Sequence, residues 1–109
     1  GAVAVQCGTA FLRAPEAATP PAHRAALSGG RTVMTRAISG RPARCLVNDF
    51  TAIADAAAAD YPVAYDIGKA LRAAASAQGH HGYGAFWAGT GAAASLARPA
   101  ADTVLAISP

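Results

Sequence analysis

The sequence opens with Gly1-Ala-Val-Ala-Val-Gln-Cys-Gly-Thr-Ala-Phe-Leu-Arg13, and this stretch carries most of the fold information. Val3 and Val5 are β-branched, and with the alanines beside them they form the short apolar run of a strand covered on both faces. The polar residues begin where this run ends. We therefore predict a buried parallel strand whose carboxyl end carries Gln6 to Thr9, at the edge where α/β sheets and barrels bind ligands.

The turn after this strand has the chemistry of a phosphate site. Gly8 lets the backbone approach a phosphate closely, and Thr9 can donate from both its backbone N–H and its hydroxyl. An ordinary strand end with a tight turn has the same residue types, so the residues alone leave both interpretations open.

Several motifs together resemble one enzyme family. The segment Val5-Gln-Cys-Gly-Thr-Ala-Phe-Leu12 is similar to the Val-Gln-x-Gly-Thr-x-Phe-Leu segment of nitronate monooxygenases, also called 2-nitropropane dioxygenases. Further resemblances follow in the family's order, at Thr35-Arg-Ala-Ile-Ser-Gly-Arg-Pro-Ala-Arg44 with Asn48 after it, at Tyr61-Pro62, at Leu71-Arg72 and at Phe86-Trp87-Ala88-Gly89. The matched positions run from residue 2 to about residue 91.

This resemblance implies a (β/α)8 TIM-type barrel that binds FMN and oxidises alkyl nitronates with molecular oxygen. It also implies that Gln6, Cys7, Gly8 and Thr9 bind the phosphate end of the cofactor. The amides of Gly8 and Thr9 and the Thr9 hydroxyl are the expected donors, Gln6 bonds the cofactor or holds the turn, and Cys7 packs. In the resembling enzymes the histidine that takes the substrate's α-proton lies earlier in the chain, so no catalytic residue is expected within residues 1–109.

Two other functions remain open. A related flavin-dependent enoyl reductase, or another flavin oxidoreductase, would use the same barrel and phosphate turn. A noncatalytic helical interaction module, whose opening strand pairs with a partner, is the alternative from another class.

Length limits the domain organisation. A complete (β/α)8 barrel needs about 250 residues, whereas this chain has 109. We therefore expect the carboxyl-terminal part of a barrel enzyme, with residues 1–13 as the last barrel strand and its phosphate-binding turn. Residues 14–109 would form a mainly helical extension, and the rest of the barrel would be the principal partner of the chain.

Helical periodicity and glycine positions predict the elements that follow. A short helix over residues 20–28 should end at Gly29 and Gly30, and residues 32–38 should be extended. A helix is predicted from Asn48, with Phe50, Ile53, Ala54 and Ala57 on one face. A second helix over 64–78 should bury Ile67, Leu71 and Ala74 and end at Gly79. A third helix should begin at about Tyr83 and carry Phe86 and Trp87, and a last helical turn or two should end by Ile107.

Other polar residues have less specific signals. Arg41 and Arg44 could face the flavin or an anionic nitronate, or tie their turn to nearby carbonyls, because a guanidinium suits both. His80 and His81 should lie in a solvated loop, and His23 has no distinguishing neighbour. No metal site is expected, because no Cys, Asp or Glu accompanies the histidines at ligand spacing.

Composition narrows the class of protein. Cys7 and Cys45 are too few for a disulfide framework and are expected as buried, reduced thiols. The charge of +3 is spread without runs, which argues against nucleic acid as a partner. The sequence contains no apolar run long enough for a membrane span and no signal peptide, so a cytoplasmic enzyme is the default expectation.

Overall fold

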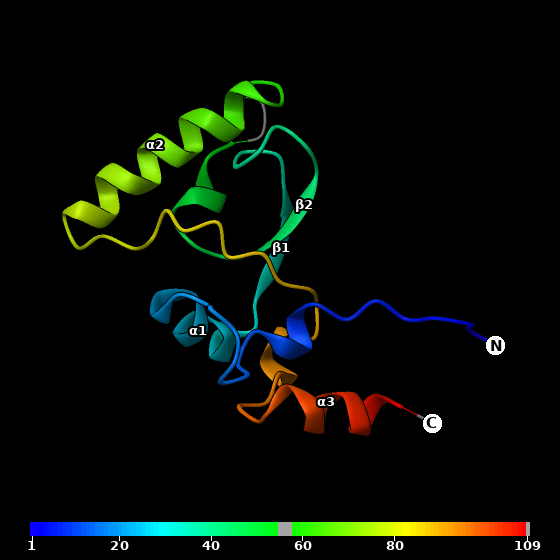
Figure 1. The fold of residues 1–109 in the computed structure, drawn as a ribbon. Helices are drawn as coiled ribbons and strands as arrows, with labels where there is room; N and C mark the ends of the chain where they lie inside the picture. Colours follow the sequence, from blue (N-terminus) through cyan, green and yellow to red (C-terminus); the bar gives the residue numbers. More distant parts are fainter. Residues whose placement is uncertain (55–57, 109) are drawn as a thin grey trace.

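The computed structural model describes residues 1–54 and 58–108. Apart from one helix of 15 residues its helices and strands are short, and the two strands lie near the middle of the molecule (Figure 1). The elements are the 3₁₀ helix η1 (Thr9–Phe11), α1 (Pro21–Ala26), the 3₁₀ helix η2 (Leu27–Gly29), β1 (Thr32–Thr35), β2 (Ala43–Leu46), the 3₁₀ helix η3 (Phe50–Ala52), α2 (Val63–Ala77), the 3₁₀ helix η5 (Ala92–Ala94) and α3 (Ala100–Ile107).

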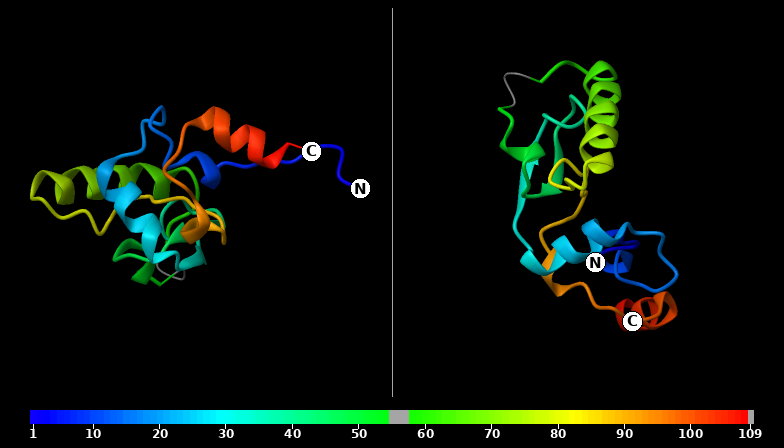
Figure 2. Two further views of the ribbon diagram at one scale, coloured as in Figure 1. Left: turned by 90° about the horizontal axis from the view of Figure 1, so that it is seen from below. Right: turned by 90° about the vertical axis from the view of Figure 1, so that its left-hand side faces the viewer.

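These elements form two lobes joined by the β1–β2 hairpin and by the segment that follows α2. One lobe holds α2, η3 and the hairpin loop, and the other holds α1, η1, η5 and α3 (Figure 2). The two chain ends lie on the same side of the molecule (Figure 1). The molecule is flattened, with principal extents of 44 × 34 × 21 Å.

The hairpin provides the central scaffold. β1 and β2 pair antiparallel, with Val33 opposite Cys45 and Met34 opposite Arg44. The prediction of extended backbone from Thr32 is confirmed through Thr35. Gly40, in the connecting loop, has φ +81°, which a side chain rarely tolerates, and a Cβ there would lie 2.4 Å from the backbone nitrogen of Tyr61.

The other edge of β2 pairs with residues 86–88. The Leu46 N–H donates to the Phe86 carbonyl at 2.9 Å, and the Ala88 N–H donates to the Arg44 carbonyl at 3.2 Å. The predicted helix from Tyr83 is therefore wrong. An unpaired edge of β2 gives these residues backbone partners, while the glycines around them disfavour a helix.

The core consists of two small clusters of buried residues. One is formed by Leu27, Leu46, Ala88 and Ala92, and lies where η2, β2 and η5 meet. The other is formed by Ala37, Ile38, Cys45 and Phe50 around the hairpin, and Trp87 packs against it. The burial predicted for the Cys45 thiol is confirmed.

The boundaries of α2 agree with the predicted helix, but its buried face does not. Ile67 and Leu71, predicted to be buried, are 60% and 36% exposed, and Ala74 is also exposed. The helix instead packs through Ala64 and Gly68. A Cβ at Gly68 would lie 3.0 Å from both the Ile38 carbonyl oxygen and the Phe50 ring, so only the small-residue face allows this close approach.

One further prediction fails, that of a helix starting at Asn48. The helix predicted from Asn48 shortens to η3, because the Asn48 side chain accepts from the Thr51 N–H and ties the chain into a turn. Ala54 lies outside any helix, and Ala57 lies outside the described residues. The helix from Pro21, its end at Gly30 with φ +65°, and the last helix ending at Ile107 are confirmed.

Residues 1–7 form no strand within this chain, so the opening barrel strand stays a prediction. Val3 and Val5 are fully and largely exposed, and Cys7 is exposed as well, which corrects the prediction of a buried thiol there. The segment runs away from the body of the molecule (Figure 1). A parallel strand needs backbone partners on its edges, and the described residues supply none to this segment.

Candidate functional site

The turn at Gly8 and Thr9 borders a surface hollow of about 420 Å³. Three separate parts of the chain line it: the turn with η1, the hairpin, and the segment after α2. The lining residues are Gly8, Thr9, Leu12, Arg44, Trp87, Ala88 and Gly89. Of the four residues predicted to bind a cofactor, Gly8 and Thr9 thus share one concave surface, whereas Gln6 and Cys7 are exposed and do not line it.

The Thr9 side chain fixes this turn to a distant segment. Its Oγ1 accepts a hydrogen bond of 2.8 Å from the Gly89 N–H. The hydroxyl keeps its own hydrogen, which it can still donate. Thr9 can therefore hold the turn and offer a donor to a ligand at the same time.

The surroundings of Gly8 show whether the turn has room for a ligand. Its backbone is helical, with φ −93°, so its conformation does not require glycine. A Cβ at Gly8 would meet no atom within 4 Å, so packing among the described residues does not require glycine either. The open space over this Cα fits the close approach of a ligand group such as a phosphate.

The structure separates the two arginines that sequence reasoning could not distinguish. Arg44 lines the hollow, and its Nη1 donates to Thr32 Oγ1 at 3.1 Å. Arg41 lies over the Tyr61 ring, with Cζ 4.0 Å from the ring centre. The hairpin register decides this difference, because Arg44 belongs to β2 whereas Arg41 belongs to the connecting loop.

The histidines do not join the hollow. His80 and His81 are exposed, as predicted, and His80 Nε2 lies 2.9 Å from Asp49 Oδ2. Within residues 1–54 and 58–108, no cluster of His, Cys, Asp and Glu could hold a metal ion.

His23, in contrast, is a buried residue that sequence reasoning passed over. It is 8% exposed and stacks on Phe86, with ring centres 4.9 Å apart. Burial lowers the pKa of His23 from 6.5, and a hydrogen bond to the Trp87 backbone opposes this shift. Its Nε2 has no hydrogen-bond partner among the residues that the structure describes. The only sequence signal was its position on the first turn of a short helix, whose inner side must face the core.

No helix in the part of the chain that the structure describes is both long and apolar enough to cross a bilayer. The exposed large apolar side chains are spread over residues 1–7, β1, α2, α3 and the segments between these elements.

Comparison with known proteins agrees with the family resemblance of the sequence motifs. The sequence model of the family described as nitronate monooxygenase matches residues 1–107. A nitronate monooxygenase of Paraburkholderia phytofirmans is 51% identical over 95% of this chain and 30% of its own length. The corresponding enzyme of Pseudomonas aeruginosa is 48% identical over 94% of this chain and 31% of its own length.

A solved structure is also similar. The nitroalkane oxidase of Streptomyces ansochromogenes superposes with a TM-score of 0.77 and 40% sequence identity, over 92% of this chain and 30% of that protein. The helices and the two-stranded sheet agree with an α/β fold. The chain spans about 30% of the length of these relatives, whose names describe enzymes. By sequence and by structure, this chain belongs to the nitronate monooxygenase family.

Proposed function

We propose that this chain forms the cofactor-phosphate end of an FMN-dependent enzyme that oxidises alkyl nitronates with molecular oxygen. Family membership supports the reaction, since the two curated relatives at about 50% identity carry that name. In this proposal residues 1–13 are the last strand and turn of a (β/α)8 barrel, and residues 14–109 are its extension. The remaining length of the relatives corresponds to the part of the barrel that would pair with residues 1–7.

The observation that carries the cofactor assignment is the unfilled space over Gly8 beside the Thr9 hydroxyl. The amides of Gly8 and Thr9 and the hydroxyl of Thr9 would donate to phosphate oxygens, with Gln6 and Cys7 completing the turn. Arg44, which lines the same hollow, supplies a positive charge. These groups position an anion and lower its free energy without taking part in redox chemistry.

The chemistry itself belongs to the cofactor. When bound, FMN supplies the acceptor for the substrate's electrons and their donor to oxygen. The contribution of this chain would be to bind and orient the phosphate end of the cofactor. We assign no base to His23, His80 or His81, because none of them lines the hollow.

The alternatives are less well supported. The names of the relatives favour nitronate or nitroalkane oxidation over enoyl reduction. Membership of a family of named enzymes also argues against a noncatalytic helical module.

The test uses the protein as its gene encodes it. Gly8→Ala should weaken FMN binding at least about tenfold, since the methyl group fills the space that the phosphate needs, whereas the thermal midpoint should stay unchanged because the Cβ meets nothing. Thr9→Val should weaken FMN binding and also lower stability by about 1 kcal/mol, because the Gly89 N–H loses its acceptor. Thr9→Ser keeps the hydroxyl and is the matched control.

Flavin fluorescence titration measures the FMN affinity, and oxygen consumption with an alkyl nitronate measures the reaction. A colourless protein, or one without nitronate-dependent oxygen uptake, would contradict the proposed function. Unchanged FMN affinity in both Gly8→Ala and Thr9→Val would contradict the site.

A further inference from the structure

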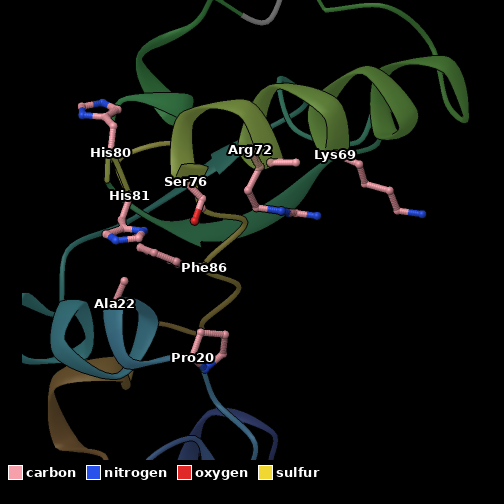
Figure 3. A pocket seen from close by; sticks show the side chains of 10 residues that line it. Pro20, Ala22, Lys69, Arg72, Ser76, His80, His81 and Phe86 are labelled. Atoms are coloured by element: carbon pink, nitrogen blue, oxygen red, sulfur yellow. The ribbon is translucent and has the colours of Figure 1, made fainter. Parts of the chain in front are cut away.

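A second pocket lies between the two lobes, on the other side of residues 86–89. Its volume is about 420 Å³, within the range of small-molecule sites. It is walled by α2 on one side and by the start of α1 on the other (Figure 3). Its lining residues are Pro20, Ala22, Lys69, Arg72, Ala73, Ser76, His80, His81, Gly84 and Phe86.

The charged groups of this pocket have one sign. Lys69 and Arg72 lie one helical turn apart on α2, and no acidic side chain is among the lining residues. The ion pairs found among the described residues are Arg36–Asp60 and His80–Asp49, so neither uses Lys69 or Arg72. Lys69 Nζ lies 4.4 Å from the centre of the Tyr65 ring, a contact that leaves its charge uncompensated. The wall formed by α2 therefore favours an anion.

The floor of the pocket is apolar and aromatic. Phe86 lies between α2 and α1 beside His81 (Figure 3), and His23 stacks on it with an interplanar angle of 13°. This stacking, together with the packing of Phe86 against the Leu27 and Leu46 cluster, holds the Phe86 ring in place. A fixed aromatic ring in a pocket that two cations also line suits a ligand that has both a flat apolar part and an anionic group.

The pocket is distinct from the phosphate turn. Phe86 lines this pocket, whereas its neighbours Trp87, Ala88 and Gly89 line the hollow at Gly8 and Thr9. The boundary between the two concave surfaces therefore falls between Phe86 and Trp87.

We propose that the pocket between α1 and α2 is a second binding site, which takes a small aromatic or flat apolar molecule bearing a phosphate or carboxylate group. Arg72 and Lys69 bind the anionic group, Ser76 offers a hydrogen bond, and the flat part lies against Phe86. The site does not depend on a bound flavin or on nitronate oxidation.

The test is a calorimetric titration of the gene-encoded protein with phenyl phosphate, which joins one phosphate to one aromatic ring. Inorganic phosphate and benzyl alcohol each carry one half of that chemistry and should bind at least about tenfold more weakly. Arg72→Gln should weaken binding of phenyl phosphate about tenfold or more, and Phe86→Leu should remove the preference over inorganic phosphate. Arg31→Gln is the matched control, since Arg31 is exposed and lines neither of the two surfaces.

Thermal midpoints show whether the variants remain folded, and Arg72→Lys, which keeps the charge, should retain part of the affinity. Absence of saturable binding to the folded parent protein up to about 10 mM, or equal binding by Arg72→Gln and Arg31→Gln, would overturn the proposal. A loss of phenyl phosphate binding in Thr9→Val would also overturn it, since the ligand would then occupy the phosphate turn. FMN retention is measured separately, so failure of this site and failure of the proposed function give different results.

Discussion

Residues 1–7 and residues 85–89 are both short segments outside the named helices and strands, but their surroundings differ. The first segment has no backbone hydrogen bond to the described chain, and Val3 and Val5 are exposed to solvent. The second pairs with β2, places Ala88 in the core and borders both concave surfaces. The difference shows that an available strand edge, more than the apolar content of a segment, decides which segment forms backbone hydrogen bonds.

Proline substitutions compare the two segments directly and should give the largest effect. Ala88→Pro removes the N–H that bonds the Arg44 carbonyl and adds bulk at a site that is 6% exposed. We expect it to lower the free energy of unfolding of the 109-residue chain by about 3 kcal/mol. Ala4→Pro, the matched control, should change it by less than about 0.5 kcal/mol. Urea unfolding followed by circular dichroism measures both.

Equal changes of the unfolding free energy in Ala88→Pro and Ala4→Pro would contradict the difference drawn between the two segments. Repeating Ala4→Pro in the gene-encoded protein sharpens it, because a loss of stability there would indicate that residues 1–7 gain a strand partner as proposed.

The pH dependence of stability compares the same two regions through Cys7 and Cys45. Burial raises the pKa of Cys45, which packs beside Trp87, from 9.0 to about 11. The unfolded chain therefore loses this proton first, and the stability present below pH 9 should decrease by about 2–3 kcal/mol as the pH rises to about 11. Cys45→Ala should lack this component of the pH dependence, whereas Cys7→Ala should keep it because Cys7 is exposed.

Unfolding measured at intervals across that pH range gives the comparison. A thiol reagent provides a second readout, since it should modify Cys7 rapidly and Cys45 only on unfolding. Equal reaction rates of the two thiols in the folded chain would show that residues 85–89 do not cover Cys45.

The smallest effect is expected at His23, which stacks on Phe86. Because its pKa lies below 6.5 in the folded chain, the unfolded chain takes up this proton first, so stability should decline as the pH falls below 6.5. His23→Phe should reduce that decline in stability, by less than Cys45→Ala reduces the decline at high pH. Replacement of the exposed His81 by glutamine should leave the decline intact. Thermal midpoints between about pH 7 and pH 5 test this, and a pH dependence unchanged by His23→Phe would mean that the ring is accessible to protons.

Glycines in the sequence correctly predicted where two helical segments end. Gly30 with φ +65° ends the helical segment from Pro21, and Gly79 with φ +76° follows α2. These positions depend on backbone conformation, which is a property of the residue itself.

Properties that depend on distant partners were not predictable in the same way. Ile67 and Leu71 form the more apolar face of α2, but Gly68 allows the closer contact with Phe50 and decides which face is buried. At the candidate site, the sequence indicated Gly8 and Thr9 but could not choose between Arg41 and Arg44. That choice depends on the register of the hairpin, which places Arg44 opposite Met34.

The hydrogen bond between Thr9 and Gly89 joins residues that are 80 positions apart. During synthesis the Gly89 N–H follows the turn at Gly8 only after those residues have been added, which takes about 4–16 s at typical rates of translation. Until then the turn has no such brace. A cofactor that needs the braced turn would consequently bind only after Gly89 has been made.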